Sequence, residues 1–185
     1  MGILAAARAG ATLYVPTFHL GGTASWLPGI SGEIPLVDAH QVRAAAQEGV
    51  EIGSHGHVHV PLDALPRSEM AEQVRRSRGV LADLTGQEIA SFCYPHGYHD
   101  ARVRREVRLA GHRNATEIGH RLHRPGTDPW AMSRVMVGPE HGPEDVVALV
   151  ERGPGPWGPA VRRALTPAWR GVRRVVRTTT GKTWT

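Results

Sequence analysis

The stretch that decides the fold is GVEIGSHGHVHVPLDALP, residues 49–66. Its first part, VEIGSH (50–55), is rich in apolar and β-branched residues and is bounded by glycine, which predicts a strand. His55 and His59 follow, four residues apart. A glycine before them and a proline after them favour a curled loop over a helix. Two imidazoles at this spacing can converge on one metal ion, and a loop at the end of a strand leaves coordination positions open for water.

Strands and helices alternate on both sides of this stretch. We expect helices at 3–9, 38–48, 67–84, 100–110 and 143–151, and strands at 11–17, 50–55, 88–95, 112–118 and 134–137. Asp38 is the expected N-cap of the second helix, whose inner face carries Val42, Ala45 and Ala46. This alternation predicts parallel βαβ units in an α/β protein, arranged as an open sheet or a barrel.

Two candidate segments fall at the same edge of the predicted sheet. His55 comes directly after one strand, and YPHGYHD (94–100) comes directly after the next. Functional sites of parallel α/β folds form at the carboxyl ends of the strands. We therefore expect the two segments to lie close together.

Composition limits the class of protein. A chain of 185 residues with 41% hydrophobic and 21% charged residues suits one globular domain. The single cysteine, Cys93, excludes an internal disulfide framework and a thiolate zinc cluster. No apolar stretch is long enough to cross a bilayer. The N-terminal segment does not have the pattern of a signal peptide, so we expect a cytoplasmic protein unless an upstream segment carries a signal.

The basic charge is confined to the C-terminal end. Residues 152–185 hold seven Arg and one Lys without Asp or Glu, which leaves 14 basic and 17 acidic residues in the first 151. The domain itself is therefore slightly acidic, and we do not expect it to bind nucleic acid. A Gly/Pro-rich hinge (153–159) precedes a basic amphipathic segment (159–177). This segment is expected to contact an anionic membrane surface, to dock on the domain or to be disordered.

Three segments carry a resemblance to a known family. GVEIGSHGHVHVPLDALP (49–66), SFCYPHGYHDARVRREVRLAGHRNA (91–115) and ATLYVPTFHLGG (11–22) resemble, in order and separation, parts of polysaccharide deacetylases with the NodB homology domain. The resemblance covers about residues 3–137. It implies a distorted (β/α) barrel without its first strand, formed by a partial domain at residues 1–152 that is followed by the tail at 153–185.

The resemblance also implies a chemistry. His55 and His59 match the family's ligands for a divalent metal, which we expect to be zinc. His57 lies between them, and the geometry of a strand end predicts that it points away. Tyr94, Pro95, Gly97 and Tyr98 match the segment that lines the substrate groove, and the backbone N–H of Tyr94 or of a neighbouring residue is a candidate donor to the oxyanion. The implied activity is hydrolysis of the amide bond of an N-acetylated saccharide or glycoconjugate. In such a site a cation activates water and polarises the acetamide carbonyl.

The chain departs from the family pattern at several positions. The Asp-Asp pair that supplies the third ligand and the base is absent, since the first Asp is Asp38. Cys93 stands where many members have an Arg. The general acid has no clear match, and His120, His123 and His141 are the candidates. Either the reading frame extends upstream through an Asp-Asp strand, which we favour, or the chain is a catalytically incomplete paralogue that binds carbohydrate or serves as a scaffold.

Overall fold

The computed structural model describes residues 2–24, 26–27, 34–124 and 126–154, together with residues 169, 171–172, 175–177 and 179. At its centre lies one sheet of five strands, all of whose pairings are parallel. They lie in chain order, β1-β2-β3-β4-β5. Their bounds are β1 (Thr12–Val15), β2 (Glu51–Ser54), β3 (Ser91–Cys93), β4 (Asn114–Ile118) and β5 (Met132–Arg134).

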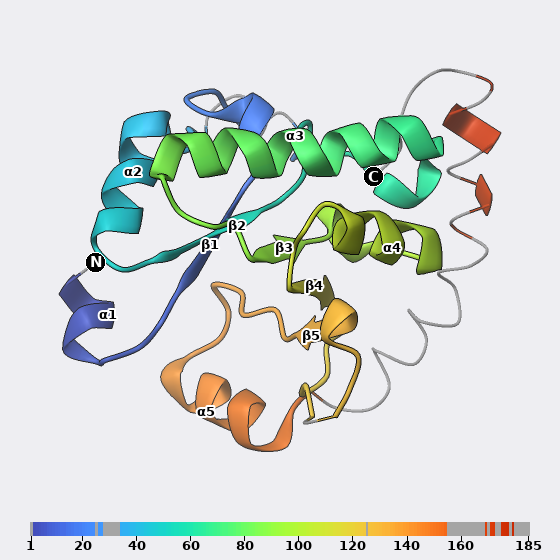
Figure 1. Ribbon diagram of the computed structural model, residues 1–185. Helices are drawn as coiled ribbons and strands as arrows, with labels where there is room; N and C mark the ends of the chain where they lie inside the picture. Colours follow the sequence, from blue (N-terminus) through green and yellow to red (C-terminus); the bar gives the residue numbers. More distant parts are fainter. Residues whose placement is uncertain are drawn as a thin grey trace.

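Helices connect these strands. The described α-helices are α1 (Gly2–Ala6), α2 (Ala39–Gln47), α3 (Arg67–Thr85), α4 (Ala101–Leu109) and α5 (Pro143–Arg152). Short 3-10 turns occur at η1 (Thr17–His19), η2 (Leu62–Ala64), η3 (Pro95–Gly97) and η4 (Pro129–Ala131). In Figure 1, α2, α3 and α4 lie along one face of the sheet and α5 lies on the other side. Within the described residues no helix has the length and apolar character needed to cross a membrane.

The strand order and the helix positions match the expected α/β class. Doubly wound sheets reverse their strand order and carry crossover helices on both faces. Here the order is consecutive, and α2, α3 and α4 share one face, which is how a (β/α) barrel winds. Among the described residues β1 and β5 are both edge strands, so the sheet is open over this part of the chain.

Specific side chains fix the ends of the helices. Asp38 accepts a hydrogen bond from the backbone N–H of Gln41 at 2.8 Å, and the Gln41 side chain accepts one from the Asp38 N–H, which completes a capping box. Asp100 caps α4 through the backbone N–H groups of Arg102 and Val103. Such caps contribute about 1 kcal/mol each. The predicted N-cap of the second helix is therefore confirmed.

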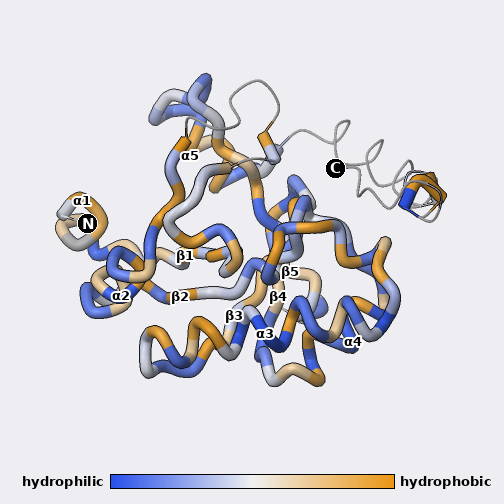
Figure 2. The backbone as a smooth tube through the Cα atoms, turned by 90° about the horizontal axis from the view of Figure 1, so that it is seen from above, coloured by the Kyte–Doolittle hydropathy of each residue, from blue (hydrophilic) through white to orange (hydrophobic). Residues whose placement is uncertain are grey.

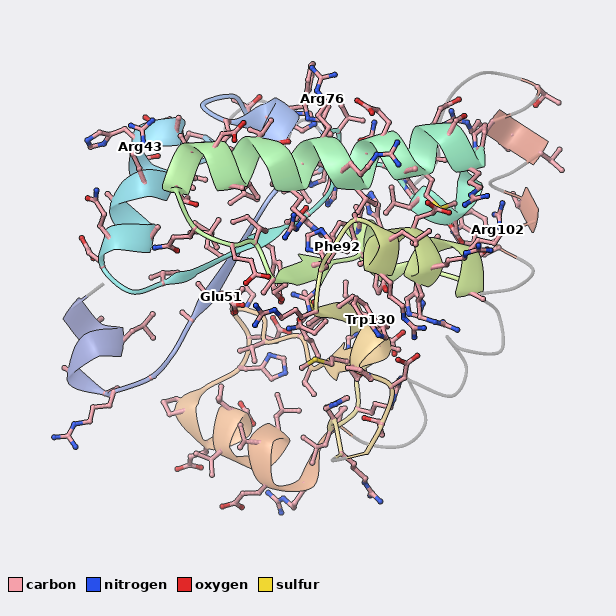
Figure 3. All side chains as sticks on the ribbon, viewed as in Figure 1. Arg43, Glu51, Arg76, Phe92, Arg102 and Trp130 are labelled. Atoms are coloured by element: carbon pink, nitrogen blue, oxygen red, sulfur yellow. The ribbon has the colours of Figure 1, made fainter. Side chains whose placement is uncertain are left out.

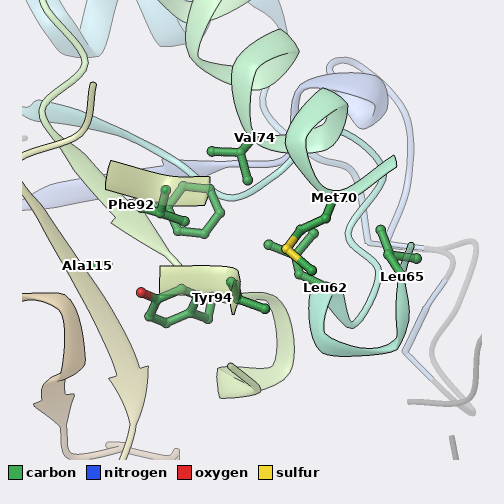
Figure 4. Packing of buried hydrophobic residues seen from close by; sticks show 9 residues of the cluster. Leu62, Leu65, Met70, Val74, Phe92, Tyr94 and Ala115 are labelled. Atoms are coloured by element: carbon green, nitrogen blue, oxygen red, sulfur yellow. The ribbon is translucent and has the colours of Figure 1, made fainter. Parts of the chain in front are cut away.

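The core lies between the sheet and the three helices that share its face. One cluster packs under α3 and α4 and is shown in Figure 4; its residues are Leu62, Leu65, Met70, Val74, Phe92, Tyr94, Val103, Val107 and Ala115. A second cluster packs under α2 and includes the predicted Val42, Ala45 and Ala46. Phe92 lies below α3, whereas Arg76 lies on the outer side of that helix (Figure 3). Figure 2 shows the corresponding alternation of hydrophobic and hydrophilic residues along α3.

The last strand differs from the expected one. The sequence predicted a strand at 134–137, but β5 is Met132–Arg134, because these residues pair with Thr116–Ile118 of β4. Met136 and Val137, which lie in the expected strand, are 50% and 55% exposed. Pairing with the neighbouring strand therefore decided the register, and local apolar character did not.

Most of the tail lies outside the described residues. The hinge predicted at 153–159 and the amphipathic helix predicted at 159–177 are described only in part. Of the tail's arginines, Arg177 forms an ion pair with Glu69 of α3. The domain boundary and the membrane contact stay predictions.

A buried histidine in the core predicts acid sensitivity. His112 is 4% exposed, and its ring centroid lies 5.2 Å from that of Phe92. Burial lowers the pKa of His112 to about 4. The unfolded chain therefore binds a proton at His112 more readily than the folded chain does. The stability that the neutral side chain gives is fully present above about pH 6.5 and is lost as the pH falls toward 4.

Replacing His112 by Leu should therefore make the protein less sensitive to acid. In urea unfolding we expect the wild type to lose about 2 kcal/mol more than His112→Leu between pH 7 and pH 5. His40→Leu, at an exposed position of α2, is the control and should track the wild type. Equal losses in all three proteins would show that His112 does not carry this pH dependence.

Candidate functional site

The loop after β2 is held in a fixed curl. The backbone N–H of His55 donates to the carbonyl of Val15 at 3.2 Å, and that of Phe18 donates to the carbonyl of His57 at 2.9 Å. On the helix side, the Gln73 side chain accepts from the N–H of Val58 at 2.9 Å. The end of β1 and helix α3 therefore clamp the loop from two sides, which limits where its histidines can point.

The two predicted histidines converge. The Nε2 atoms of His55 and His59 lie 3.2 Å apart. His55 Nδ1 lies 2.7 Å from the carbonyl oxygen of Cys93, which can only accept, so Nδ1 carries the proton and the Nε2 lone pair faces His59. His59 has φ +52°, is 8% exposed, and its Nδ1 is buried without a hydrogen-bond partner in the described structure. A non-glycine residue at positive φ is uncommon and marks a constrained position.

This geometry fits two ligands of one cation. Two nitrogens about 2.0–2.1 Å from a zinc ion and separated by a tetrahedral angle lie roughly 3.4 Å apart. The observed 3.2 Å is close to this value. The carbonyl of Cys93 accepts a hydrogen bond from His55 and so fixes the orientation of its ring. Metal-bound imidazoles are commonly oriented by such a hydrogen bond from the nitrogen that does not bind the metal. However, the described residues contain no group of three or more His, Cys, Asp or Glu that could hold a metal ion, so the pair is one ligand short of a usual catalytic site.

Both imidazoles are kept neutral. Burial lowers the pKa of His55 to about 4, although its hydrogen bond to the Cys93 carbonyl acts in the opposite direction. Burial lowers the pKa of His59 to about 3, and the neighbouring His55 and His96 add to the effect. A metal ligand must be deprotonated, and both side chains satisfy this condition at neutral pH.

Aromatic rings surround His59. The ring centroid of Trp26 lies 4.3 Å from that of His59, and the centroid of His96 lies 4.5 Å from it on the η3 turn. His57 instead lies 2.8 Å from Thr17 Oγ1 and contacts the Phe18 ring. His57 thus faces away from the pair, as expected.

The sequence analysis did not identify His96 and Trp26 as site residues. His96 occupies the variable position of the Y-P-x-G motif, and Trp26 belongs to no motif.

Tyr94 requires a correction. Its side chain is fully buried in the core, and its hydroxyl donates to the carbonyl of Trp130 at 2.8 Å. Its backbone N–H donates to the carbonyl of Thr116 at 3.1 Å as part of the sheet. Tyr94 therefore neither lines a groove with its side chain nor has an N–H left for an oxyanion, since alternation along β3 turns its side chain toward the helices.

The other three groove candidates have different surroundings. Pro95 is buried. A Cβ atom at Gly56 would lie 3.5 Å from its ring, so Pro95 packs against the loop that carries the histidines. Gly97 has φ +75° and packs against the backbone of Ile118. Tyr98 is half-buried and stacks on His96, with ring centroids 6.3 Å apart. Of the four residues predicted to line the groove, Tyr98 is thus the one whose ring continues the row formed by His59 and His96.

A polar network holds the segment that follows β3, residues 94–100, against β4. His99 Nε2 lies 2.5 Å from the carboxylate of Glu117, and its Nδ1 lies 3.1 Å from the Arg104 guanidinium. The His99 ring stacks on Tyr94 at 4.3 Å. These contacts satisfy both ring nitrogens of His99, so its role is to anchor the turn that carries His96.

The three candidates for the general acid make contacts elsewhere. His123 contacts the hydroxyl of Thr127, and His141 accepts from the N–H of Gly138 beside Glu140. His120 has φ +47°, and its N–H donates to the carbonyl of Arg134. Nothing in these contacts selects one of them as an acid, so that role stays a prediction.

The structure is an α/β protein with a parallel sheet and two neutral, converging imidazoles at the carboxyl ends of its strands. The family model for polysaccharide deacetylases matches residues 1–115. The chain therefore belongs to the polysaccharide deacetylase family. No protein of curated function matches it.

Solved structures share its fold. The Streptococcus pyogenes deacetylase PplD, solved with acetate, is 17% identical with a TM-score of 0.67, over 81% of this chain and 62% of that one. A de-N-acetylase from Aggregatibacter actinomycetemcomitans is 18% identical with a TM-score of 0.65, over 79% and 67%. IcaB from Ammonifex degensii is 21% identical with a TM-score of 0.64, over 75% and 60%. The chain thus spans about two thirds or less of the length of these relatives, and the likeness is one of fold.

Proposed function

We propose that this protein hydrolyses the amide bond of N-acetylated saccharides with the help of a divalent cation, for which zinc is the first choice. The observation that carries the proposal is the 3.2 Å approach of His55 Nε2 to His59 Nε2 at the carboxyl end of β2, in a member of the polysaccharide deacetylase family. The substrate class follows from that family, and one structural relative is itself described as a de-N-acetylase.

The residues of the chain have defined tasks in this proposal. His55 and His59 would hold the cation, and the Cys93 carbonyl keeps the Nε2 lone pair of His55 directed at it. A cation held there would lower the pKa of a bound water and polarise the acetamide carbonyl. Trp26, His96 and Tyr98 form the aromatic surroundings against which a sugar ring could be placed.

The test is release of acetate from N-acetylglucosamine oligosaccharides. With zinc or cobalt added we expect the wild type to release acetate and His55→Ala to fall to the background rate, because one of two nitrogen ligands is lost. His57→Ala should keep the wild-type rate, since His57 faces Thr17. If the wild type releases no more acetate than His55→Ala, the proposed hydrolysis is wrong.

One observation favours a second function. Within the described residues no acidic side chain joins the two histidines in a potential metal site, and hydrolysis needs a group that accepts the proton of water. A chain without that group could still bind N-acetylated saccharides without cleaving them. Oligosaccharide binding by calorimetry in the absence of acetate release would identify this non-catalytic function.

A further inference from the structure

The C-terminal tail carries an apolar stripe. The described positions of the tail from residue 169 onward are helical. On a helix, side chains that are three, four or seven residues apart lie on one face. Trp169, Val172 and Val176 have this spacing, and Val175 lies three residues after Val172. These four side chains therefore form one stripe along the helix.

Two side chains of this stripe are exposed to solvent. Val172 is 44% exposed and Val175 is 62% exposed, whereas Trp169 and Val176 are half-buried. A helix that packs on a globular domain normally turns its apolar stripe toward the core of that domain. Packing within the chain therefore accounts for one side of the stripe, and the other side is open to a partner.

An ion pair joins this helix to the start of α3. Arg177 donates to the carboxylate of Glu69, the third residue of α3. In Figure 1 the described tail residues, drawn in red, lie beside this end of α3. Helix α3 begins shortly after the loop that carries His55 and His59. The tail is therefore attached on the side of the sheet where the strands end.

The charge of the tail indicates which partner fits the exposed side of the stripe. Residues 152–185 contain seven Arg and one Lys without Asp or Glu, and Arg170, Arg173 and Arg174 fall within the stretch that carries the stripe. A nucleic acid matches this charge, but its phosphates offer no apolar partner to exposed valines. An anionic lipid surface accepts both, because basic side chains contact the headgroups while apolar side chains enter the acyl boundary.

We propose that the tail helix binds an anionic lipid surface through Val172 and Val175, together with the basic residues of the tail. The valines insert at the boundary between headgroups and acyl chains, and the basic side chains supply the attraction to the surface. The ion pair between Arg177 and Glu69 links the lipid-bound helix to α3. The carboxyl ends of the strands are thereby held near the lipid surface.

The experiment measures co-sedimentation of the full chain with vesicles of phosphatidylcholine and phosphatidylglycerol. The wild type should bind these vesicles about tenfold or more tightly than vesicles of phosphatidylcholine alone, because only the mixed vesicles attract the basic tail. A higher salt concentration should release it. The double variant Val172→Asp, Val175→Asp should bind the mixed vesicles about tenfold or more weakly than the wild type, since charged side chains do not enter the acyl boundary.

Two further variants serve as controls. The double variant Val147→Asp, Val150→Asp makes the same change in net charge at two exposed valines of α5, so it should bind the mixed vesicles as the wild type does. Glu69→Gln removes the ion pair and leaves the stripe intact. It should bind at least as tightly as the wild type, because Arg177 can then contact the headgroups. A general loss of structure would not preserve binding in this way.

Several results would overturn the proposal. One is a wild type that does not bind the mixed vesicles, and another is an equal loss of binding in the two double variants. A third is double-stranded DNA that binds the wild type as tightly as the vesicles do, with no effect of the changes at Val172 and Val175, because charge alone would then explain the tail. A fourth is a dimer that these two changes dissociate, which would assign the stripe to a second copy of the chain. The samples contain neither metal nor saccharide, so the outcome is independent of the proposed hydrolysis.

Discussion

His59→Ala is expected to lower the affinity of the protein for zinc or cobalt by at least about a hundredfold, and His55→Ala should have the same effect. Loss of an outer partner of a metal ligand alone typically costs about 10–100-fold in affinity, so loss of one of two imidazole ligands should cost more. Calorimetry with zinc, or the visible spectrum of the cobalt-loaded protein, measures the effect directly.

His57→Ala is the matched control for this prediction. It lies between the two ligands in sequence, but its Nδ1 lies 2.8 Å from Thr17 Oγ1 and its ring contacts Phe18. We expect its metal affinity to be that of the wild type. If His57→Ala weakens binding as much as His59→Ala, the loop as a whole and not the Nε2 pair would be responsible. If none of the three changes affinity, the metal binds elsewhere.

The fold could be predicted largely from the sequence because its signals are local. Asp38 was expected to cap the second helix, and its side chain caps α2 in the structure. Strand ends were harder to predict, because pairing with a neighbour sets them. The early start of β5 at Met132 depends on its register with β4, which no local pattern contains.

The candidate site could be predicted less completely. His55 and His59 converge as expected, since one short loop carries both. Tyr94 was assigned to the groove from its motif, yet alternation along β3 places its side chain in the core. Arg134 reaches Cys93 from a strand 41 residues further along the chain, so the contact depends on tertiary packing alone.

Gly97→Ala should clearly destabilise the protein. Gly97 has φ +75°, and a Cβ at this position would lie 2.9 Å from the backbone nitrogen of Ile118. The left-handed conformation costs a non-glycine residue about 1–2 kcal/mol. Overpacking against a backbone atom adds roughly 1–3 kcal/mol. We therefore expect urea unfolding to show a loss of about 3 kcal/mol in the free energy of unfolding.

Gly86→Ala separates the two causes. Gly86 has φ +67°, and no atom lies within 4 Å of the position where its Cβ would be. It should therefore show the conformational cost alone, about 1 kcal/mol. The substitution at Gly97 should in addition weaken zinc binding, because a shift of its turn moves His96, whose ring lies 4.5 Å from that of His59. Equal destabilisation by the two substitutions would mean that the Ile118 backbone yields to the added methyl group. Unchanged zinc binding in Gly97→Ala would mean that the turn at Gly97 does not set the position of His96.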